Sequence, residues 1–193
     1  MSELDKYEQL LSGLSTGKIE GETLPPFADQ FRGRTREVIM NDADMIEVGP
    51  DDETQTIGTS SLGGCLAIVA VVEDLSGKRR CGLGHYDPMS LCLELEKRST
   101  PESVARLFNS TAQTNKDKLV KKGVIVMSVD PDGQDKAFVD GIKTEAHYLL
   151  GCDDVIVIKY GNQPSDRLDV SVPNHNNGSP SYSIATESGS LNW

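Results

Sequence analysis

The chain has 193 residues, of which 37% are hydrophobic, and its 19 Lys and Arg against 30 Asp and Glu give a formal net charge of −11. This length and composition suffice for a buried core and exclude intrinsic disorder as a description of the whole chain. We therefore expect a single domain over residues 1–193. The acidic balance and the scattered basic residues argue against binding to nucleic acid or to a membrane surface.

The cysteines and the first residues indicate where the protein works. The four cysteines form no Cys-x-x-Cys pair, which disfavours a disulfide scaffold and a structural zinc site. The chain begins with acidic residues where a classical signal peptide is basic and then apolar, and no apolar run approaches the roughly 18 residues of a membrane span. We expect a soluble protein that acts in the cytoplasm, or in a host cytosol after delivery by a secretion system that needs no such signal.

Hydrophobic periodicity predicts the elements of the first half. A short amphipathic helix is expected over 3–14, and a loop-rich connection over 18–36. Short strands separated by Asp, Asn, Gly and Pro clusters are expected at 37–40, 45–48 and 54–57. The apolar run 66–72 predicts a central strand covered on both faces, and 80–86 predicts its antiparallel partner across a turn centred on Leu75.

The second half predicts helices that alternate with strands. Ser99 or Thr100 caps a helix that runs toward Leu119, and a second helix over 135–150 ends at Gly151. Strands are expected on both sides of this second helix and again near the end of the chain, at 124–129, 155–160, 168–172 and 182–186. A strand–helix–strand order implies a parallel pair, and a hairpin implies an antiparallel one, so the fold class is α+β with mixed pairing.

One pair of residues in the predicted hairpin could carry chemistry. A hairpin centred on Leu75 places Cys65 opposite His85, with Cα atoms about 4.5–5.5 Å apart. A thiol becomes a good nucleophile when a nearby imidazole takes its proton and, once charged, stabilises the thiolate. The imidazole can later donate that proton to a leaving group. Such an activated thiolate is expected to react with iodoacetamide at pH ~6.

The loop before Cys65 adds groups that a thiol nucleophile uses. Gly63 and Gly64 allow backbone N–H groups to approach a substrate carbonyl, and with the N–H of Cys65 they are candidates for an oxyanion hole. A third group must hold the imidazole in its reactive orientation. We assign that role to the hydroxyl of Thr59 in preference to the two serines that follow it, which residue chemistry alone barely distinguishes.

These residues resemble a known family. The run Thr59-Ser60-Ser61-Leu62-Gly63-Gly64-Cys65, followed by a hairpin that ends in Gly82-Leu83-Gly84-His85, resembles the motif of the CheD chemoreceptor glutamine deamidases. It is also similar to the active sites of cytotoxic necrotizing factor and of the Burkholderia lethal factor, with Gly63 where those toxins have Ser. The resemblance covers about a sixth of the chain. His85 is followed by Tyr86-Asp87-Pro88 in place of the longer apolar stretch usual in CheD proteins, which favours a toxin-like or effector-like relative.

The resemblance implies a fold and an activity. Family members sandwich mixed β-sheets with helices on the outside, and they convert glutamine side chains of proteins to glutamate with release of ammonia. The family's nucleophile falls on Cys65, its histidine on His85, and the threonine of the CheD and lethal-factor branches on Thr59. No cofactor or metal is implied, and the partner is a protein that presents a glutamine side chain.

Two other functions are compatible with the same residues. The Cys65–His85 dyad also suits transglutamination, in which an amine replaces water, or peptide-bond cleavage. In a different class, the chain is a non-catalytic acidic module that binds a protein and in which Cys65 only packs, as buried cysteines commonly do. The sequence carries no indication of oligomeric state or of the identity of the substrate protein.

Overall fold

The structure is a computed structural model that describes residues 35–95, 101–113, 116–161, 166–184 and 187–191. These residues belong to one compact unit, Arg34–Trp193. The helix expected at 3–14 lies outside the described residues, as does the connection expected at 18–36 except for its last two residues. The expectation of a single domain over the whole chain stays a prediction.

The described residues form two five-stranded sheets. The first, which we call the outer sheet, contains in spatial order β1 (Thr35–Glu37), β3 (Gln55–Thr59), β8 (Leu168–Val172), β9 (Ser181–Ile184) and β10 (Glu187–Ser190). The second, the central sheet, contains in spatial order β2 (Asp42–Val48), β5 (Arg79–Tyr86), β4 (Leu66–Asp74), β6 (Leu119–Ser128) and β7 (Val155–Lys159). Both sheets mix parallel and antiparallel pairs, since β1 pairs with β3 and β6 with β7 in parallel.

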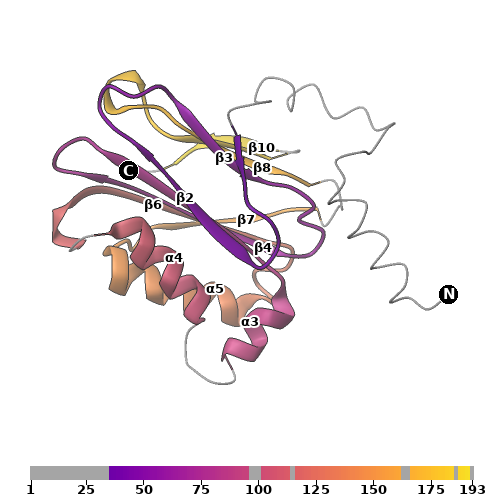
Figure 1. Ribbon diagram of the computed structural model, residues 1–193. Helices are drawn as coiled ribbons and strands as arrows, with labels where there is room; N and C mark the ends of the chain where they lie inside the picture. The colour runs from indigo at the N-terminus through magenta and orange to yellow at the C-terminus, as the bar shows by residue number, and fades with distance from the viewer. Residues whose placement is uncertain (1–34, 96–100, 114–115, 162–165, 185–186, 192–193) are drawn as a thin grey trace, which may run out of the picture. The chain divides into compact units, whose positions relative to one another are not determined.

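Helices cover the face of the central sheet that points away from the outer sheet (Figure 1). They are α3 (Pro88–Leu95), α4 (Glu102–Ala112) and α5 (Lys136–Glu145), the last continued by the π-helical turn η2 (Ala146–Leu150). Single 3-10 turns, η1 (Lys116–Lys118) and η3 (His175–Asn177), complete the elements of the described residues. The predicted α+β class, with a sandwich-like core and helices outside, is confirmed.

Strand β4 shows why the layers assemble in this way. Its odd-numbered residues, such as Val69, share one apolar cluster with Ile57 and Val170 of the outer sheet. Its even-numbered residues, such as Ile68, share a second cluster with Phe108 of α4. A strand that is apolar at every position has no face suited to water, so it takes the central place covered on both sides. The expectation of a central, doubly covered strand over 66–72 is confirmed.

The helices differ from the prediction in two places. The helix expected to run toward Leu119 ends at Ala112, because Gln113 adopts a left-handed conformation (φ 50°) that closes the helix, and Leu119 begins β6 instead. Helix α3 was not predicted at all. Its sequence does contain a start, since Asp87 accepts hydrogen bonds from the N–H groups of Met89 and Ser90, and Pro88 occupies the first helical position.

The hairpin formed by β4 and β5 is present, but its turn is centred on Ser76 and not on Leu75. Asp74 and Lys78 close a three-residue loop, and Gly77 takes the left-handed conformation (φ 79°) that such loops require near their end. The Asp74 carboxylate also accepts hydrogen bonds from the N–H and hydroxyl of Ser76. Because the centre of the turn lies one residue later than predicted, each residue of β4 pairs with a residue of β5 that lies two positions later than predicted.

Candidate active site

The shifted register changes the relation between the two residues expected to face each other. His85 pairs with Ala67, so the prediction that it stands directly opposite Cys65 was wrong. Cys65 lies one residue before the start of β4 and two residues before Ala67, so a strand continued to Cys65 would place it on the same face as His85, as a diagonal neighbour at a typical Cα distance of about 7–8 Å. The two residues therefore lie at the same end of the β4–β5 hairpin without being cross-strand partners.

His85 is held by a residue from the other sheet. It lies on the face of the central sheet that carries the inter-sheet core, and Thr59 ends β3 of the outer sheet. The Thr59 hydroxyl lies 2.7 Å from Nδ1 of His85, and both residues are buried. The structure thus brings Thr59 to the imidazole, whereas the hydroxyl of Ser60 donates to Glu37 and Ser61 is exposed.

The hydrogen bonds of Thr59 determine which nitrogen of His85 carries the proton. The hydroxyl has one hydrogen, and it donates this hydrogen to the carbonyl of Val38 at 2.7 Å. It must therefore accept from His85, which requires a proton on Nδ1. In the neutral imidazole Nε2 then carries a lone pair, which is the form that a general base needs.

The second ring nitrogen of His85 has no partner. Within the described residues Nε2 is the buried side-chain nitrogen or oxygen that lacks a hydrogen bond, and the residue is 1% exposed. Burying a polar atom without a partner costs free energy, so such atoms are uncommon outside functional sites. Burial lowers the pKa of His85 below its ordinary value, and the carboxylate of Glu37 opposes that shift only in part. The imidazole is therefore neutral at pH 7 and ready to accept a proton.

The surroundings of Cys65 favour the neutral thiol. Its side chain is almost fully buried, and burial together with the charge of Asp87 raises its pKa to about 11. The expectation of a thiolate that reacts at pH ~6 is therefore not supported by the site, which instead suits a mechanism in which His85 removes the proton during attack. The sulfur contacts the side chain of Met40, since Sγ lies 3.7 Å from Sδ of Met40.

The glycine loop is shaped as a tight turn. Gly63 and Gly64 have φ of 21° and 96°, values that residues with a Cβ rarely adopt. The N–H of Cys65 donates to the Leu62 carbonyl, and that of Gly64 donates to the Tyr160 hydroxyl. Two of the three expected donors are thus already engaged, so the three-donor oxyanion hole is not preformed in this conformation.

Tyr160, which sequence analysis did not single out, organises this loop. It follows β7 and is buried, and its hydroxyl donates to the Cys65 carbonyl at 2.5 Å while accepting the N–H of Gly64 at 3.2 Å. A third contact reaches the Leu62 carbonyl at 3.2 Å. The only indication in the sequence is a polar-tipped aromatic at the end of a predicted strand, because its partners lie more than 90 residues away along the chain.

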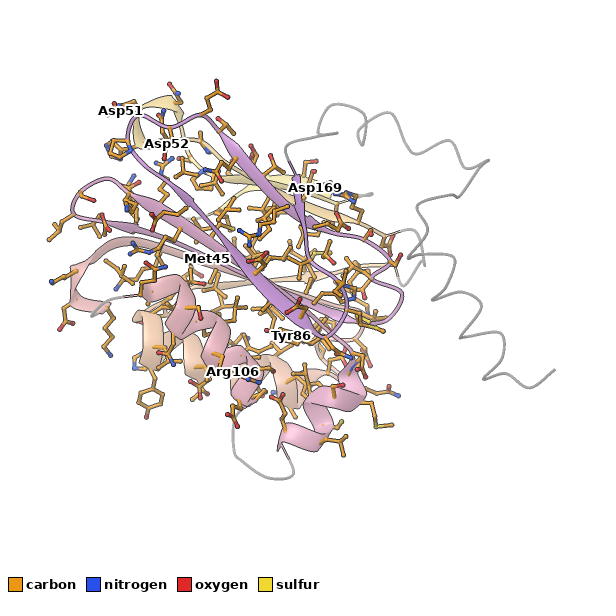
Figure 2. The ribbon with its side chains drawn as sticks, in the orientation of Figure 1. Met45, Asp51, Asp52, Tyr86, Arg106 and Asp169 are labelled. Atoms are coloured by element: carbon orange, nitrogen blue, oxygen red, sulfur yellow. The ribbon has the colours of Figure 1, made fainter. Side chains whose placement is uncertain are left out.

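The remaining cysteines lie apart from this cluster. Cys81 and Cys152 are buried in the two apolar clusters, where burial raises the pKa of both thiols, and Cys92 is exposed on α3. A cavity of about 410 Å³ lies against the central sheet. It opens between β2 and α4 on the helix side, and Met45, Tyr86 and Arg106, labelled in Figure 2, are among its lining residues.

Comparison with known proteins leaves the site to be interpreted from its geometry. No family model matches the chain, and a search of curated proteins finds no match either. In the part of the chain that the structure describes, none of the helices has the length and apolar character needed to cross a membrane.

Proposed function

We propose that the protein is a cysteine hydrolase that deamidates glutamine side chains of proteins. The observation that carries the proposal is the buried Thr59–His85 hydrogen bond, which leaves Nε2 of His85 unpartnered at the end of the β4–β5 hairpin where Cys65 lies. In most buried histidines with a purely structural role, both nitrogens are hydrogen-bonded. The resemblance of the Thr59–Cys65 run to deamidase motifs supplies the substrate class.

The proposed reaction follows from the protonation states at the site. Nε2 of His85 takes the thiol proton of Cys65 as the sulfur attacks the carboxamide carbon of a glutamine side chain. The imidazolium then gives that proton to the amide nitrogen, the C–N bond breaks, ammonia leaves, and a thioester remains. Water, deprotonated by Nε2, attacks the thioester and releases glutamate and the regenerated thiol. The balance is glutamine plus water to glutamate plus ammonia.

Thr59 acts on this reaction through His85. Its hydroxyl keeps the proton on Nδ1, and it also stabilises the imidazolium, because the charged ring donates a stronger hydrogen bond than the neutral ring. The raised pKa of Cys65 fits the same scheme, since a neutral thiol and a neutral imidazole exchange a proton only when a substrate is being attacked.

The test uses mass spectrometry in isotopically labelled water. A cell extract is incubated with the protein in H₂¹⁸O, and enzymatic deamidation adds about 3 Da to the modified residue because the new carboxylate oxygen comes from solvent through the thioester. Cys65→Ser and His85→Ala variants serve as controls. Labelling at particular glutamines that both variants lose supports the proposal, and identical labelling by all three proteins rejects it.

A second candidate is a non-catalytic protein-binding module. The observation that favours it is the covered, neutral Cys65, since a packed cysteine has the same burial and raised pKa. The labelling experiment separates the two functions because a binding module changes no mass. Adding a primary amine to the same incubation tests the remaining chemistry on this dyad, since a transglutaminase attaches the amine to the glutamine and a deamidase yields glutamate.

A further inference from the structure

Met40 covers the sulfur of Cys65. The Met40 thioether lies 3.7 Å from the thiol, and Met40 is 47% exposed whereas Cys65 is only 7% exposed. The methionine side chain therefore stands between the proposed nucleophile and solvent. Any substrate that reaches the thiol from that side must first displace it.

The backbone beside Met40 is anchored by hydrogen bonds, whereas its side chain is half exposed. Asn41, the next residue, has a left-handed conformation (φ 61°), and its N–H donates to the carbonyl of His85 at 2.6 Å. Its side-chain amide donates to the Asp87 carboxylate at 2.8 Å and accepts the N–H of Asp87 at 3.1 Å. Three hydrogen bonds thus fix the loop to β5 and to the start of α3, and rotation about the side-chain torsions of Met40 would break its contact with Cys65 without moving the loop.

The chemistry of the cover resembles that of the proposed substrate. Methionine and glutamine side chains both begin with two methylene groups, and the methionine sulfur occupies the place of the glutamine carboxamide carbon. That sulfur lies 3.7 Å from the thiol, close to the roughly 3–3.5 Å at which reacting atoms are poised for attack. A thioether has no carbonyl group, so the thiol cannot attack it.

We propose that Met40 occupies the glutamine position of the site and acts as an internal, unreactive mimic of the substrate that an incoming glutamine displaces. The identity of the displaced substrate rests on the proposed deamidase function, whereas the shielding of the thiol by Met40 is independent of that function. This arrangement makes Met40 a residue that limits access to the thiol, and it places the substrate's methylene groups along the path that the methionine side chain now takes.

The cover is tested by the reactivity of the thiol toward iodoacetamide at pH 8, measured by peptide mapping. Met40→Ala should raise the alkylation rate of Cys65 about tenfold, equivalent to about 1.4 kcal/mol of barrier. Met40→Leu, which keeps the bulk of the side chain, should stay near the wild-type rate. Exposed Cys92 is the internal reference in every sample, and thermal unfolding of each variant checks the fold. Equal alkylation rates for Met40→Ala and the wild type would show that Met40 does not shield the Cys65 thiol.

The substrate position is tested by Met40→Gln, which places a carboxamide where the thioether was. Without added substrate, the variant should gain about 1 Da at position 40 as its new side chain is deamidated, or lose about 17 Da if the thioester forms and water cannot reach it. The same substitution combined with Cys65→Ser or with His85→Ala should change no mass.

The two tests separate the cover from the enzyme activity. Faster alkylation in Met40→Ala together with a mass change in Met40→Gln supports the whole inference. Faster alkylation without a mass change keeps the cover but rejects position 40 as the site of the glutamine. A third outcome is that the wild-type protein deamidates cellular proteins while Cys65 of the Met40→Ala variant is alkylated at the wild-type rate. That result keeps the proposed function and shows that Met40 does not shield the thiol.

Discussion

The protonation state of Cys65 gives the sharpest prediction that needs no substrate. With a thiol pKa of about 11, roughly one molecule in 10⁴ carries a thiolate at pH 7, against about one in 30 for a free cysteine. Alkylation of Cys65 should therefore rise about tenfold for each pH unit between pH 6 and 10 and level off only above that range. The assay is the pH dependence of iodoacetamide labelling, with Cys92 followed in the same samples.

Asp87→Asn perturbs the second cause of that raised pKa. Its carboxylate disfavours the thiolate, so removing the charge lowers the pKa of Cys65 and increases the thiolate fraction at every pH below it. We expect alkylation about threefold faster, because burial remains the larger cause. Asparagine is itself a good helix N-cap, so α3 should keep its start.

A flat labelling rate between pH 6 and 9 would refute this reasoning. It would mean that the thiolate is already formed and paired with a charged His85, as in cysteine enzymes with a strongly depressed thiol pKa. A rate that rises with pH but does not change in Asp87→Asn would keep the neutral thiol and remove Asp87 as a cause.

Three further predictions follow from single contacts. Thr59→Val leaves the Nδ1–H of His85 unpaired, at a cost of about 1–3 kcal/mol, so the rate of deamidation should fall about 5- to 150-fold. Thr59→Ser keeps the hydroxyl and should retain most of the activity. Equal loss in both variants would exclude the hydroxyl as the cause. Tyr160→Phe should lower the free energy of unfolding in urea by about 1–2 kcal/mol and speed amide exchange at Gly64, and unchanged exchange would contradict the assigned role. In Gly82→Ala the new Cβ would lie 2.1 Å from Oγ1 of Thr111, so unfolding should become easier by about 1–3 kcal/mol; Gly161→Ala, which meets nothing within 4 Å, is the matched control.

The layers of the fold could be predicted because they depend on local patterns. The uninterrupted apolar run in β4 demands cover on both faces, and the helix before β7 implies a parallel pair, as found. The register of the β4–β5 hairpin could not be predicted from such local patterns. It depends on which residue of a Gly-containing turn takes the left-handed conformation, and Gly77 with the Asp74 side chain decides this.

The candidate site was predictable to the extent that its residues lie in one short motif. The loop before β4 and the end of β5 are close in sequence, and the structure places Thr59 on the His85 ring as the motif suggested. Met40 and Tyr160 reach the same site from 25 and 95 residues away along the chain, so no local pattern reveals them. The raised pKa of Cys65 depends on burial, which only the assembled layers produce.

The hydrogen bond between Thr59 and His85 joins strands that belong to different sheets. Each sheet alone therefore holds only part of the constellation, and a chain whose sheets have separated lacks an oriented imidazole. Under the proposed function, activity and tertiary integrity should be lost together on heating or in denaturant. A newly made or partly unfolded molecule would then leave the glutamines of surrounding proteins unmodified until its two sheets pack together.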